Sequence, residues 1–84
     1  MRTNPHNVIK IAKDLERKEL AERSYNELSE DQVSPESLLV QYLSERLNID
    51  PQLIKDVIED LISNKQIAVA SIDGKRYFKK IPKF

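Results

Sequence analysis

Four basic residues near the C-terminus are the most concentrated source of chemistry in this sequence. They are Lys75, Arg76, Lys79 and Lys80, with Lys65 and Lys83 on either side. Residues 65–84 carry six Lys or Arg against one Asp or Glu, a net charge of +5, although the whole chain is neutral. Cations held close together release counterions when they bind a phosphate backbone. The cluster therefore predicts contact with phosphates, and Arg76 is placed to enter a minor groove.

Two other interpretations of the same basic residues stay open. Lysines on an exposed strand discourage pairing with the edges of other sheets, which is protection and not recognition. A basic surface also attracts an acidic protein partner.

The centre of the chain has the opposite charge. Residues 35–64 carry two Lys or Arg against six Asp or Glu. Gln52 and Lys55 are the candidates for base contacts, because they stand at the start of a predicted helix. The acidic residues that follow on its outward face are Asp56, Glu59 and Asp60. These would repel phosphates, so an ordinary solvated helix face competes with DNA recognition.

The residues needed for catalysis or metal binding are scarce. Gly74 is the only glycine, His6 is the only histidine, and cysteine is absent. A glycine-rich phosphate loop and a thiolate metal site are therefore excluded. We expect no enzymatic activity, no metal, no cofactor and no small-molecule substrate. Tyr42 and Tyr77 are expected at the edge of the core and not as stacking platforms for bases.

The N-terminal third is expected to form a helix that starts at Pro5, capped by Asn4, and continues at least to Arg23. Its first apolar stripe is Val8, Ile11, Ala12 and Leu15. A second, rotated stripe is Leu20, Ala21, Tyr25 and Leu28. Either the helix bends near Ser24 or its two ends face different neighbours. Because the helix is longer than a small core needs, residues of the second stripe could pair with a second copy of the chain.

Two further helices begin with a capping residue followed by proline. Ser34 with Pro35 starts one, and Asp50 with Pro51 starts the other, which ends near Asn64. The stripe expected to be buried on the earlier helix is Leu38, Leu39, Tyr42, Leu43 and Leu47. On the later helix it is Leu53, Ile54, Val57, Ile58, Leu61 and Ile62.

The C-terminal quarter is expected to form a β-hairpin. Residues 67–72 and 75–81 are rich in strand-forming types, and Asp73-Gly74 between them is typical of a two-residue turn. The loop length fixes which residues of the two strands face each other. The residues expected on the core face are Ile67, Val69 and Phe78.

This order of elements resembles the winged helix-turn-helix family over residues 33–81. The resemblance is carried by the turn Leu47-Asn48-Ile49-Asp50-Pro51, the helix-to-hairpin junction at residues 61–67, and the hairpin tip Asp73-Gly74. The family often has glycine at the junction near Asn64, where this chain has asparagine, which also tolerates a left-handed backbone.

The resemblance implies a DNA-binding protein, such as a small transcriptional regulator or accessory factor. Its third helix would enter the major groove at Gln52 and Lys55, and its wing would contact phosphates through Lys75, Arg76, Lys79 and Lys80. Many members instead bind proteins, so the alternative is a partner that docks on the acidic third helix or on residues 81–84.

The expected fold class is therefore α+β, mainly α: a winged helix of three helices and a C-terminal β-hairpin. A chain of 84 residues has room for one domain. Residues 1–32 would form its N-terminal helix region and residues 33–81 its helix-turn-helix and wing. No stretch resembles a signal peptide or a membrane span, so we expect a cytoplasmic protein.

Overall fold

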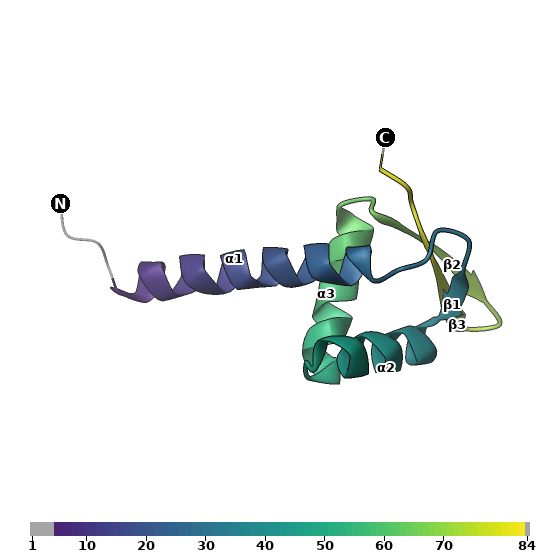
Figure 1. Ribbon diagram of the computed structural model, residues 1–84, viewed down its shortest axis with the longest axis horizontal. Coiled ribbons are helices and arrows are strands. Elements are labelled where there is room, and N and C mark those ends of the chain that lie inside the picture. Colours follow the sequence, from purple (N-terminus) through teal and green to yellow (C-terminus); the bar gives the residue numbers. More distant parts are fainter. Residues whose placement is uncertain (1–4, 84) are drawn as a thin grey trace.

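The computed structural model describes the backbone of residues 5–83 and the side chains of residues 15–83. Its elements are α1 (Pro5–Asn26), β1 (Val33–Pro35), α2 (Glu36–Leu47), α3 (Pro51–Ser63), β2 (Ile67–Ile72) and β3 (Lys75–Lys80) (Figure 1). The strands form one antiparallel sheet in the order β1-β3-β2. The predicted α+β winged-helix arrangement is confirmed over this part of the chain. A short strand before α2 enlarges the predicted hairpin to a sheet of three strands.

Helix α1 is one unbroken helix whose first half extends beyond the rest of the molecule (Figure 1). Asn4 and the side chains of Val8, Ile11 and Ala12 lie outside the described residues. Tyr25 and Ala21 are buried, and Leu20 and Leu28 pack against the core. The second stripe therefore faces this chain's own core, which removes the reason for expecting it to pair with a second copy. Among the side chains that the structure describes, it is those of the C-terminal half of α1 that meet the core.

The turn between α2 and α3 follows the predicted pattern. The Asp50 side chain accepts a hydrogen bond from the backbone N–H of Gln52, at 2.8 Å, and Pro51 is the first residue of α3. Asn48 ends α2 in the left-handed conformation, with φ at 56°. A short side chain that tolerates this conformation lets the backbone reverse within a few residues.

The predicted start of α2 was wrong. Ser34 belongs to β1 and lies opposite Phe78, and the helix begins only at Glu36, with no side-chain cap from Pro35. Ser34 and Pro35 do resemble a helix start, but pairing with β3 holds both residues extended. This pairing joins positions that are far apart in the sequence, and no local pattern indicates it.

The hairpin has the predicted turn and register. Asp73 and Gly74 both have positive φ, 52° and 76°, as a type I′ turn requires. Val69 lies opposite Phe78, and Ile72 lies opposite Lys75. The returning strand ends at Lys80, one residue earlier than expected. The residue after it still donates its backbone N–H to the carbonyl of Gln66, at 2.9 Å.

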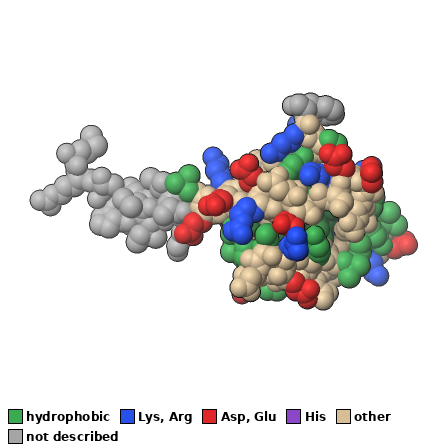
Figure 2. Space-filling model, in the orientation of Figure 1, with side chains coloured by type: hydrophobic (Ala, Val, Ile, Leu, Met, Phe, Trp, Pro, Cys, Tyr) green, Lys and Arg blue, Asp and Glu red, His purple; other side chains and the backbone are tan. Residues whose placement is uncertain are grey.

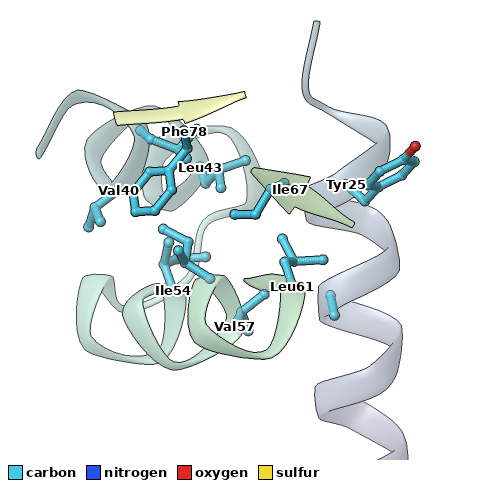
Figure 3. Close-up of a cluster of buried hydrophobic side chains, with 11 residues drawn as sticks. Tyr25, Val40, Leu43, Ile54, Val57, Leu61, Ile67 and Phe78 are labelled. Atoms are coloured by element: carbon cyan, nitrogen blue, oxygen red, sulfur yellow. The ribbon is translucent and has the colours of Figure 1, made fainter. Parts of the chain in front are cut away.

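The core lies between the apolar faces of α2 and α3, the inner face of the sheet and the C-terminal half of α1 (Figure 3). Helix α3 supplies Ile54, Val57, Ile58 and Leu61, each at most 1% exposed, as its periodicity predicted. Phe78 and Ile67 reach this cluster from the sheet. Each large apolar side chain buried in this way contributes about 1.5–3 kcal/mol.

Two details of the predicted core and one of the junction after α3 were wrong. Leu38 and Tyr42 are 59% and 46% exposed, and Val40 is buried in their place, because β1 turns α2 toward the sheet. Val69 is 44% exposed although it lies opposite the buried Phe78, because β2 is an edge strand of the sheet. The left-handed residue after α3 is Lys65, with φ at 57°, and not Asn64, with φ at −87°.

Replacing Ser24 by alanine should stabilise the fold. Its hydroxyl is fully buried in α1 and has no hydrogen-bond partner among the described residues. An unsatisfied buried polar group costs about 1–3 kcal/mol, and alanine is also the better helix former. Urea denaturation should show a higher midpoint for Ser24→Ala. Ala21→Ser, which adds a hydroxyl to the same buried face, should lower it; a lower midpoint for Ser24→Ala would contradict this account.

Candidate nucleic-acid interface

The four basic residues of β3 do not form one patch. Side chains alternate between the two faces of a strand. Phe78 is buried, so Arg76 and Lys80 share its inner side, whereas Lys75 and Lys79 lie on the outer face with Tyr77. The predicted cluster is therefore divided into two pairs by the pleat of the strand.

Arg76 is held by acidic residues of two helices. Its guanidinium forms ion pairs with Glu36 of α2 and Glu59 of α3, the latter at 2.7 Å. It also lies 5.3 Å from the centre of the Phe78 ring. The hydrogen bonds that Arg76 donates to Glu59 and Glu36 raise the pKa of Arg76 above its ordinary value. In this arrangement Arg76 joins the wing to the helices, and its charge is already balanced by two carboxylates.

Lys80 takes part in joining the end of the chain to α1. Its ammonium donates to the Leu28 carbonyl at 3.2 Å and lies 4.4 Å from the centre of the Tyr25 ring. Lys83 approaches the same ring at 4.8 Å. The Tyr25 hydroxyl donates to the carbonyl of Ile81 at 2.5 Å. Cation–π contacts and this hydrogen bond thus fix residues 80–83, the basic end of the wing, against α1.

Lys75 and Lys79 are the two basic residues of β3 that remain exposed. Neither has an ion pair or hydrogen bond with any described residue. The strand residues on their face of the sheet are Val33, Pro35, Ala68, Ala70, Ile72, Lys75, Tyr77 and Lys79. This outer face therefore carries two lysines and no carboxylate.

Gln52 and Lys55 are exposed at the start of α3, as predicted. They are separated from β1 and the sheet by the length of α2, about 18 Å for its twelve residues (Figure 1). The structure thus does not bring them next to the basic residues of β3.

The acidic residues on α3 are partly used inside the molecule. Arg17 of α1 binds the Asp60 carboxylate with two nitrogens, at 2.5 and 3.1 Å, and donates to the Asp56 carbonyl at 3.3 Å. Glu59 binds Arg76. These ion pairs hold α1 and the wing to α3. They also occupy much of the acidic face that a protein partner was expected to use.

An apolar surface that the sequence did not predict lies beside the sheet. Val33, Leu38 and Tyr42 are each more than 40% exposed. They line a groove of about 500 Å³ that Lys79 also borders. Figure 2 shows hydrophobic side chains gathered at the strand end of the molecule. The apolar stripe of α2 did not predict this exposure, because helical spacing does not indicate which edge of an apolar stripe will be covered by other elements.

Two other features concern metals and membranes. Among the described residues, no group of three or more His, Cys, Asp or Glu side chains is arranged to hold a metal ion. Within the same part of the chain, no helix is long and apolar enough to cross a membrane. The candidate metal ligand His6 and the C-terminal Phe84 lie outside the described side chains.

Comparison with known proteins adds no relative. No family model, no curated protein and no solved structure matches this chain. The winged-helix arrangement is accordingly an observation about the fold, and function has to be argued from the surface of this chain.

Arg76→Gln should destabilise the protein through the pair of carboxylates it leaves behind. Glu36 and Glu59 would then face each other without a cation. The groups are partly exposed, between 36% and 54%, so the loss should be at most about 1 kcal/mol and smaller at high salt. Urea denaturation of Arg76→Gln, Glu59→Gln and the double variant would measure the coupling. Lys75→Gln, next to it on the outer face, should change nothing; an equal loss there would contradict the proposed role.

Proposed function

We propose that this chain is a winged helix-turn-helix DNA-binding protein, a small transcriptional regulator or accessory factor that contacts phosphates mainly through the outer face of its wing. The observation that carries the proposal is the pair Lys75 and Lys79, exposed on one strand and free of carboxylates on their own face. A lysine that is already paired with a carboxylate of its own chain must break that pair before it binds a phosphate. Lys75 and Lys79 have no such pair among the described residues.

The third helix has a limited part in this proposal. Gln52 and Lys55 are the proposed base contacts, because they are exposed at the N-terminal end of α3 and precede its acidic residues. Of the acidic residues that follow, Glu59 and Asp60 are paired with Arg76 and Arg17, so Asp56 is the one that would repel a phosphate backbone. We therefore expect weak sequence preference and affinity dominated by salt-sensitive phosphate contacts.

Removing both exposed lysines should weaken binding and its dependence on salt. The Lys75→Ala/Lys79→Ala variant would be titrated into a labelled random DNA duplex, with anisotropy followed at about 50 and 200 mM salt. Each lost phosphate contact should reduce the slope of log K against log salt by about 0.9, so the double variant should lose about 1.8. Lys18→Ala/Arg23→Ala removes the same charge from exposed residues of α1 and is the matched control.

The two variants separate a local contact from a general effect of charge. Equal losses in both would mean that net charge alone drives binding and would remove the wing from the proposal. Absence of binding by the unaltered protein at low salt would overturn DNA binding. The alternative function, a protein-interaction module, would then be pursued at the exposed apolar residues Val33, Leu38 and Tyr42.

A further inference from the structure

We propose that the outer face of the sheet binds single-stranded nucleic acid, with Tyr77 as a stacking platform for a base and Lys75 and Lys79 as phosphate contacts. The inference rests on the proposed nucleic-acid binding and names the form of nucleic acid that this face fits. Tyr77 would then bind a base, whereas an aromatic residue at the edge of the core only contributes to packing.

Tyr77 lies on β3 midway between Lys75 and Lys79, and all three side chains point to the outer face. The two lysines are four residues apart on an extended strand, which corresponds to about 13 Å. A polynucleotide that crosses Tyr77 along β3 therefore passes one cation on each side of the ring.

The residues beside the Tyr77 ring on the neighbouring strands are small. Tyr77 occupies the central strand, with Ala70 directly opposite on β2 and Pro35 directly opposite on β1. Ala70 is too short to cover an aromatic ring, and Pro35 is compact. The two residues directly beside Tyr77 on the neighbouring strands are therefore small, which leaves part of the half-buried ring open for a base to stack on.

Tyr77 differs from Tyr25, the tyrosine that packs in the core. Tyr25 is 3% exposed, and its hydroxyl donates to a backbone carbonyl, as buried tyrosines usually do. Tyr77 is half-buried, and its hydroxyl has no partner among the described residues. The fold therefore does not use the polar end of Tyr77, and its ring lies on the face opposite to Phe78.

The charge of the outer face of the sheet favours a polyanion. The eight strand residues of the outer face include two lysines and no acid. Glu36 and Glu59 of the helices are paired with Arg76 on the inner side, whereas Glu27 and Glu45 border the groove beside Lys79. Single strands expose the faces of their bases, whereas a duplex stacks them internally, so only a single strand could use both the ring and the lysines.

The test compares a labelled oligothymidine of about 16 nucleotides with a duplex of equal length. Tyr77→Leu keeps an apolar side chain of strand-compatible size but removes the ring. It should weaken oligothymidine binding about tenfold or more and leave duplex binding unchanged. Tyr42→Leu, which removes an exposed tyrosine from α2, should bind both as the unaltered protein does. Circular dichroism and thermal unfolding would establish that each variant is folded.

A second variant gives a direct signal of stacking. The chain has no tryptophan, so Tyr77→Trp would carry the only one. It should retain oligothymidine binding, and its emission should be quenched as the complex forms. Unquenched emission at saturation would overturn the stacking role.

The outcomes distinguish this inference from the proposed function. If Tyr77→Leu binds oligothymidine as the unaltered protein does, while Lys75→Ala/Lys79→Ala weakens both probes, phosphate binding stands and the platform is overturned. If neither probe binds at low salt, both proposals fail. Selective loss of single-strand binding in Tyr77→Leu supports the platform.

Discussion

The pairing of β3 with a strand on each side is the constraint on which the rest of the structure depends. Because β3 is central and Phe78 is buried in the core, the faces of all its residues are fixed. Arg76 and Lys80 must then turn inward, where acidic helices and the end of α1 bind them. Lys75, Tyr77 and Lys79 lie on the opposite, outer face of the sheet. One buried phenylalanine thus separates the cations used within the fold from those available for function.

Some of the opposite charges of this neutral chain are paired internally across the elements. Arg17 holds α1 to Asp60 of α3, and Arg76 holds the wing to Glu59 of the same helix. Such partly exposed ion pairs add little stability individually, but they bring the acidic face of α3 into contact with both neighbours. A small domain with limited core area gains orientation in this way. The consequence for function is that α3 is better suited to supporting the wing than to reading bases along its length.

The C-terminal half of α1 is also held to the rest of the domain by contacts between distant residues. Tyr25 packs in the core through its ring and binds the carbonyl of Ile81 through its hydroxyl, while Lys80 lies over the ring. This joins residues distant in the sequence and closes the sheet against the first helix. The N-terminal half of α1 extends beyond this contact (Figure 1).

The sequence by itself determined the elements whose signals are local. The Asp50 cap with Pro51, the periodic face of α3 and the Asp73-Gly74 turn fixed α3, the hairpin and its register, because capping, periodicity and turn geometry act over a few residues. Tertiary structure alone decided that Ser34 joins a strand and that Leu38 is exposed, since both depend on pairing with β3. It also decided that Arg76 is bound by Glu36 and Glu59. The sequence could show that these charges exist, but only packing brings residues 17 to 40 positions apart within reach of one another.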